Sequence, residues 1–136
     1  MKALTTAIFG KLSGSLLDTD IGGRLFKGQA PDGTEFPYVV YLIVSDVPDD
    51  VFAKKGESVL IQFSLFSSAS GSTEVEDMYS HLKTLYDDCS MTITGAVLAW
   101  FHRQSAILMV EDYTTAAGTQ KVWHYAVDYE VTIQYS

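Results

Sequence analysis

The sequence predicts an α+β domain in which a single antiparallel sheet of about four to five strands carries two helices on one face. Three observations lead to this fold class: an N-terminal helical segment, an amphipathic helical segment in mid-chain, and two long hairpins that flank the second segment. The chain has 136 residues, of which 47% are hydrophobic and 3 are prolines, enough for a packed core. We therefore expect residues 1–136 to form a single domain.

The first hairpin runs from Phe36 to Phe66. Its first half contains six consecutive apolar residues, Val39 to Val44, of the β-branched and aromatic types that favour strands. Its second half, Val59 to Phe66, alternates between a core face and a mixed face. The segment between the two strands carries turn residues and charges, so we expect a tip, Asp46 to Glu57, that protrudes into solvent.

Two segments have helical periodicity. Ala3 to Leu17 places its apolar residues close to one stripe, although Gly10 and Gly14 each cost about 1 kcal/mol in a helix interior. Val75 to Cys89 follows an i, i+3, i+4, i+7 pattern, and its apolar face must lie on the sheet. Asp87 and the acidic residue after it oppose the helix dipole, which predicts that this helix frays at its end.

The second hairpin occupies the C-terminal part of the chain. The apolar residues of Ala96 to Glu111 change parity midway, which predicts a bulge near Arg103 to Ser105. Trp123 to Tyr135 alternates regularly, and Asp112 to Gln120 forms the connecting loop. Two helices do not cover this much apolar sheet, so we expect part of it to be buried against another subunit. A short strand is also expected at Arg24 to Phe26.

Composition excludes several classes of protein. The formal net charge of −8 disfavours binding to a phosphate backbone, which requires a basic patch. The single cysteine, Cys89, excludes an internal disulfide. No apolar run approaches the roughly 20 residues of a membrane span, and the N-terminal segment does not have the apolar centre of a signal peptide. We expect a soluble protein without a membrane association.

The residues that could carry chemistry do not form a recognised motif. The three histidines, His81, His102 and His124, are widely separated, and none belongs to a pair with metal-ligand spacing. Cys89 has no partner histidine nearby in the sequence. The acidic residues of the first hairpin lack the spacing of a calcium loop and fit a solvated tip better. We expect no catalytic residues, no metal and no cofactor.

The chain as a whole resembles a known family. The residues that carry the resemblance are Gly22 to Phe26 (GGRLF), Pro31, Phe36 to Val40 (FPYVV) and Ser45-Asp46, in this order between the two predicted helices. These segments resemble the tail completion or tail terminator proteins of long-tailed bacteriophages and related gene-transfer particles. The resemblance implies a structural protein that is not an enzyme.

The resemblance also implies a place and partners. Such a protein forms a ring, with six copies as the expected number, at the head-proximal end of the tail tube. It ends tube polymerisation and provides the head–tail joining surface, so its partners are its own copies, the tail tube protein and the head–tail connector proteins. It is expected in the host cytoplasm during assembly and then in the virion, where DNA passes through the ring without being specifically bound.

Two groups of residues are the predicted contact sites. The tips of the two hairpins are candidate subunit or tube contacts, with these members: Asp46, Pro48, Asp49, Asp50, Lys54, Lys55, Thr114, Thr115 and Gly118. Asp128 and Glu130, on the polar side of the last strand, are candidate lumen-facing charges that would repel DNA.

Two alternative functions remain open from the sequence. A head-side connector or adaptor protein differs in remaining with emptied heads instead of with purified tails. A small soluble ligand-binding domain or enzyme would require a pocket with convergent polar groups.

Overall fold

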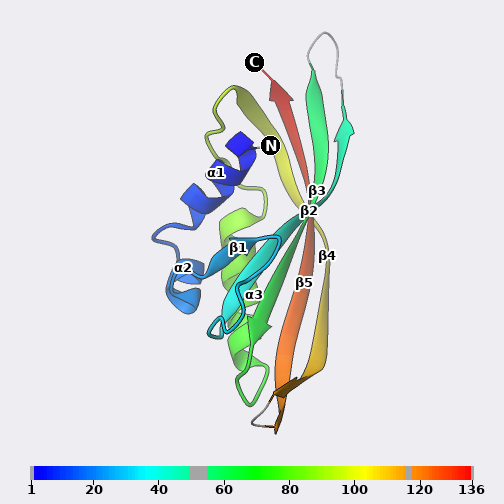
Figure 1. The fold of residues 1–136 in the computed structure, drawn as a ribbon. Coiled ribbons are helices and arrows are strands. Elements are labelled where there is room, and N and C mark those ends of the chain that lie inside the picture. Colours follow the sequence, from blue (N-terminus) through cyan, green and yellow to red (C-terminus); the bar gives the residue numbers. More distant parts are fainter. Residues whose placement is uncertain (1, 50–54, 116–117, 136) are drawn as a thin grey trace.

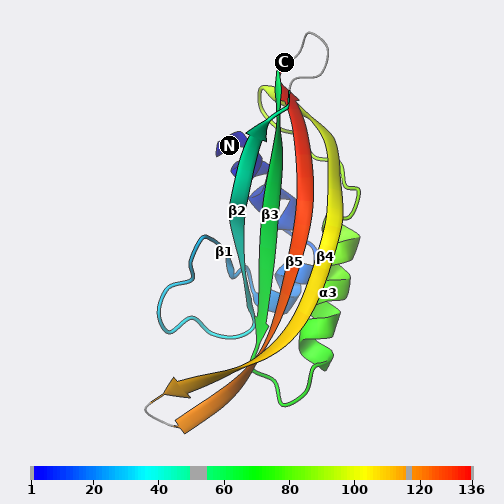
Figure 2. The same cartoon turned by 90° about the vertical axis from the view of Figure 1, so that its right-hand side faces the viewer.

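Three helices and five strands make up the computed structural model, which describes residues 2–49, 55–115 and 118–135. All three helices lie on one face of a single sheet, and the opposite face is uncovered (Figures 1 and 2). In chain order the elements are α1 (Lys2–Leu12), α2 (Leu16–Ile21), β1 (Leu25–Lys27), β2 (Tyr38–Pro48), β3 (Gly56–Ser67), α3 (Thr73–Tyr86), β4 (Ala96–Thr115) and β5 (Gly118–Tyr135).

The sheet is mixed, with the strand order β1-β2-β3-β5-β4. The four long strands pair antiparallel, as expected, but β1 runs parallel to β2 with Leu25 opposite Val39. The prediction of an antiparallel sheet is therefore wrong for β1. The physical reason is the loop 28–37, which carries the chain back to the end of the sheet where β1 begins.

The N-terminal segment forms two helices where the sequence predicts one. Gly14 has a φ of +77°, which a right-handed helix does not contain. Ser15 then begins α2 by accepting a hydrogen bond from the backbone N–H of Asp18 at 3.1 Å. The break lets α1 and α2 turn separately against the sheet, so three helices cover it instead of two.

The third helix matches its prediction in the middle and differs at its end. α3 buries four side chains, Val75, Met78, Leu82 and Tyr86, along one stripe. The predicted fraying at its end is wrong, because the backbone N–H of Asp87 donates to the carbonyl of Lys83 at 2.9 Å. The carboxylate of Asp87 accepts hydrogen bonds from β4 and β5, which compensates for its unfavourable position relative to the helix dipole.

The core lies between the three helices and the covered face of the sheet. Phe63 is at its centre, with its ring centroid 5.0 Å from that of Tyr86 and 5.6 Å from that of Tyr129. The Tyr86 hydroxyl donates to the backbone carbonyl of Ile8 at 2.9 Å, which connects α3 to α1. The register of β4 against β5 shifts between Arg103 and Ser105, which confirms the predicted bulge.

Candidate interaction surfaces

The uncovered face of the sheet carries a polar centre. The Asp128 carboxylate on β5 accepts a hydrogen bond from the Gln62 side-chain amide at 3.0 Å and another from the Ser105 hydroxyl at 3.2 Å. These three residues lie side by side across β3, β5 and β4. The two hydrogen bonds hold a half-buried negative charge in a defined position on the uncovered face.

Glu130 lies next to this centre on the same face. It is half-buried and pairs in register with Leu60 on β3 and His102 on β4. The structure therefore brings Asp128 and Glu130, the two predicted lumen-facing acids, together on the uncovered face. Their role in a ring stays a prediction.

Aromatic rings occupy the end of the uncovered face from which the β4–β5 hairpin extends. Phe66 stacks on His124 with ring centroids 4.4 Å apart, and Tyr38 stacks on Phe66 at 4.9 Å. The His124 Nδ1 lies 2.6 Å from a carboxylate oxygen of Glu111 on β4. Tyr38 and Phe66 of this row also line a shallow groove of about 340 Å³ beside residues 28–30.

The two predicted contact tips lie at opposite ends of the sheet (Figure 1). Asp46, Pro48, Asp49 and Lys55 gather at the end of the β2–β3 pair, whereas Asp50 and Lys54 fall outside the described residues. Partial burial raises the pKa of the Asp46 carboxyl, and the neighbouring Glu57 raises it further. The two tips therefore do not form one continuous surface on the same copy of the protein.

The second tip belongs to an arm formed by the ends of β4 and β5. The arm extends beyond the helices and bends away from the rest of the sheet (Figure 2). Thr114 pairs with Thr119 and Thr115 with Gly118 at its end. The predicted contact residues Thr114, Thr115 and Gly118 are thus placed on a protruding ladder, where the sequence predicts a longer irregular loop.

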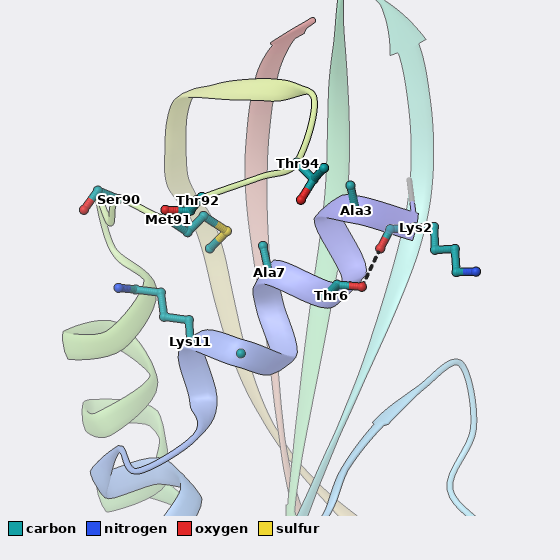
Figure 3. A pocket seen from close by; sticks show the side chains of 10 residues that line it. Lys2, Ala3, Thr6, Ala7, Lys11, Ser90, Met91, Thr92 and Thr94 are labelled. Atoms are coloured by element: carbon teal, nitrogen blue, oxygen red, sulfur yellow. Dashed lines mark hydrogen bonds between the residues drawn. The ribbon is translucent and has the colours of Figure 1, made fainter. Parts of the chain in front are cut away.

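A groove on the helix side was not identified from the sequence. It has a volume of about 750 Å³ and lies between α1 and residues 90–94 (Figure 3). Lys2 and Lys11 stand at its rim, and the methionine of the 90–94 segment, Met91, lines it. The groove is open and its two charged lining residues are both cationic, in a protein whose net charge is −8.

Sequence reasoning also missed the exposure of four consecutive apolar residues on β4, from Ile107 to Val110. The signal was present, because the run is readable in the sequence, but its strand was expected to bury one of its two faces. In the structure β4 is the edge strand of the sheet, and these four side chains are 37–59% exposed. A run of exposed apolar residues of this length is a candidate contact surface.

The titratable residues pair with one another instead of forming a cluster. His81 contacts Asp20, His102 lies 3.3 Å from Asp88, and no group of three potential metal ligands occurs among the residues that the structure describes. Burial raises the pKa of Cys89 to about 11.

No helix in the described ranges is long and apolar enough to cross a membrane.

Comparison with solved structures identifies proteins of the same fold. A chain in the virion of a native gene transfer agent particle matches with a TM-score of 0.75 and 10% identity, over 96% of this chain and 94% of that one. A second solved structure matches with a TM-score of 0.53 and 14% identity over the same shares. At these identities the likeness establishes the fold only.

Comparison of sequences identifies the family. The model of the family described as tail completion protein gp17 matches residues 6–134. No protein with a curated function matches the sequence significantly. Because the matched residues reach from within α1 to the end part of β5, the chain belongs to the tail completion protein gp17 family, a family of structural proteins of the phage tail.

Proposed function

We propose that this protein closes the head-proximal end of the phage tail tube as a ring, ends tube polymerisation and offers the surface on which the filled head docks. The observation that carries the proposal is the match of the tail completion family model to residues 6–134, nearly the whole chain. The fold shared with a chain of a gene transfer agent virion supports a place in the particle. The role is mechanical and involves no catalysis.

A closed ring requires that one patch of each copy meets a different patch of the next copy. The molecule offers two distinct patches on separate elements, the β2–β3 end and the β4–β5 arm. Six copies are the number we propose. The tail tube protein and the head–tail connector proteins are the partners on the two sides of the ring.

The uncovered face fits the lumen of such a ring. The centre of this face carries the half-buried acids Asp128 and Glu130. The side-chain amide of Gln62 donates a hydrogen bond to the Asp128 carboxylate. Negative charge on the wall would repel the DNA phosphates and let the genome pass without sticking. In the virion, DNA is therefore a passing molecule and not a ligand.

Electron microscopy of particles that lack the protein tests this function. Without it, we expect tubes of irregular length and filled heads that remain unjoined, and supplying the intact chain should restore joined particles. In fractionated wild-type particles the protein should remain with purified tails. Retention by emptied heads instead would show a head-side connector, and normal tails without the protein would overturn the proposal.

A further inference from the structure

The exposed apolar side chains of this protein are concentrated on two strands. On β2 they are Leu42, Val44 and Val47, which follow the part of the strand paired with β1. On β4 they are Val97, Trp100 and the run Ile107 to Val110. In the described part of the chain, all other large exposed apolar residues are these: Phe9, Leu16 and Tyr135.

Both strands also have an outer edge without a neighbouring strand. β1 pairs only with Val39 to Tyr41, so the outer edge of β2 from Leu42 to Pro48 has no strand beside it in the described ranges. β4 is the last strand on the other side of the sheet. An exposed apolar edge is a template for pairing with another strand.

These two strands run in opposite directions, which suits an antiparallel pairing between copies. β2 and β3, β3 and β5, and β5 and β4 are all antiparallel pairs, so β4 runs opposite to β2 within one chain. A rotation about an axis roughly along the strands preserves strand direction. The β4 edge of one copy would therefore meet the β2 edge of the next copy in antiparallel orientation, which is the more stable kind of pairing.

We infer that neighbouring copies of this protein join edge to edge, with β4 of one copy pairing with β2, beyond Tyr41, of the next. A second copy is the fitting partner because one chain supplies both halves of the contact, and the two halves differ, as a ring requires. This inference rests on the proposed ring and specifies its contact.

The details of both edges narrow the contact further. Register shifts interrupt β4 between Leu98 and Trp100 and between Arg103 and Ser105, so its longest regular stretch begins at Ser105. This stretch contains the apolar run. In the register of one chain Leu42 on β2 lies level with Ser105 on β4, and the apolar run begins level with Val40, beside β1. The proposed contact therefore requires a stagger between copies, which closing tilted strands into a ring introduces. The apolar side chains of both edges would then be buried together.

Chemical cross-linking with paired cysteines tests the contact on the full chain. In a Cys89→Ser background, Ser45→Cys places a thiol on β2 and Ser105→Cys places one on β4, and both serines are exposed on the uncovered face. Within one chain these strands are three strand spacings apart, about 14 Å. That separation exceeds what a disulfide spans, so oxidation can join only different copies.

We expect oxidation, or a short bis-maleimide, to give a ladder of linked copies from this double variant. The matched control combines Ser45→Cys with Ser80→Cys, which is exposed on α3, and should give no ladder. A ring seen by light scattering without the β2–β4 ladder would overturn the inference and leave the ring intact. Dimers formed by Ser105→Cys alone would show β4 against β4 and would also overturn it.

Lysine substitutions test the same contact without any cysteine. Val47→Lys on β2 and Ile107→Lys on β4 change side chains that are 56% and 59% exposed, so circular dichroism should show an intact fold. Each should raise the concentration needed for ring assembly at least tenfold. Leu16→Lys, at a site that is 64% exposed on α2, is the matched control and should assemble normally.

Mixing the two lysine variants gives the most specific result. Each keeps one intact edge, so the mixture should form a dimer that neither variant forms alone, and no ring. Rings from Val47→Lys and Ile107→Lys that assemble as the unmodified chain does would overturn the inference. If the unmodified chain stays monomeric even with tube protein, and tails lacking it are normal, the proposed function itself fails.

Discussion

The hydroxyl of Tyr129 on β5 donates a hydrogen bond of 2.6 Å to the carboxylate of Asp87, the residue directly after α3. The Arg103 guanidinium on β4 donates to the same carboxylate through Nε at 3.1 Å and also contacts the Tyr79 hydroxyl at 3.0 Å. One carboxylate thus ties the end of the main helix to both strands of the second hairpin. Burial, and then this hydrogen bond, raise the pKa of Tyr129, so the donor stays protonated at physiological pH.

Removing the hydroxyl in Tyr129→Phe should lower the free energy of unfolding by about 1–2 kcal/mol, because the half-buried Asp87 carboxylate loses one donor. Asp87→Ala should cost more, about 2–3 kcal/mol, since it leaves the buried Tyr129 hydroxyl without its acceptor. Urea denaturation followed by circular dichroism measures both. Equal stabilities of Asp87→Ala and the unmodified protein would contradict the role given to this carboxylate.

Two glycines should respond oppositely to alanine. A Cβ added at Gly56 would lie 2.5 Å from the carbonyl oxygen of Ile133 and 2.7 Å from that of Asp49, so the backbone at the start of β3 must shift. Gly56→Ala should destabilise the fold by about 1–3 kcal/mol. At Gly10 in α1 a Cβ would meet nothing within 4 Å, and Gly10→Ala should stabilise by about 0.5–1 kcal/mol. Thermal and urea unfolding of the two variants compare them directly.

The thiol of Cys89 should react slowly in the folded protein. Burial raises its pKa from 9.0 to about 11, so at pH 8 the thiolate fraction, and with it the reaction rate, falls about a hundredfold. The rate with a thiol reagent should rise up to about pH 11, and denaturant should restore the ordinary rate. Because the folded pKa is the higher one, this group contributes stability below pH 9 that is lost as pH rises through about 11. A fast reaction at pH 8 in the native protein would contradict this assignment.

Reversing charge on the uncovered face should affect genome passage if that face lines the lumen. Glu130→Lys should slow DNA ejection or leave DNA bound to purified rings, because a cation attracts the phosphates. Glu130→Gln removes the charge without reversing it and serves as the control, with a smaller effect. Ejection kinetics at low and moderate salt measure the difference. Unchanged ejection in particles that carry Glu130→Lys would argue against a lumen position.

Shortening the arm should separate folding from assembly. Tyr113 pairs with Gln120, so residues 114–119 can be replaced by Asn-Gly, which favours a tight hairpin turn. We expect the stability to be nearly unchanged, since the arm lies beyond the helices, while ring formation or binding to the tube protein is lost. Scattering and pull-down with tube protein measure both. Normal assembly of this variant would show that the arm tip is not a contact.

Local periodicity determined much of this fold. The apolar stripe of α3, the alternation of β5 and the change of parity in β4 are properties of neighbouring residues, so α3, β5 and the bulge near Arg103 could be predicted. The acidic pair Asp128 and Glu130 was assigned to the polar side of its strand for the same reason. The short segments that resemble the tail completion family also lie in the sequence, and the family match confirms them.

Only the tertiary structure decided how these elements combine. The placement of β5 between β3 and β4, the parallel pairing of β1, the anchoring of Asp87 by Arg103 and the exposure of the Ile107 to Val110 run depend on residues far apart in the chain. The separation of the two hairpin tips to opposite ends follows from the same strand order. Periodicity reports which side of an element is apolar. Packing between distant segments decides which element covers that side, or whether the side stays exposed and available to another copy.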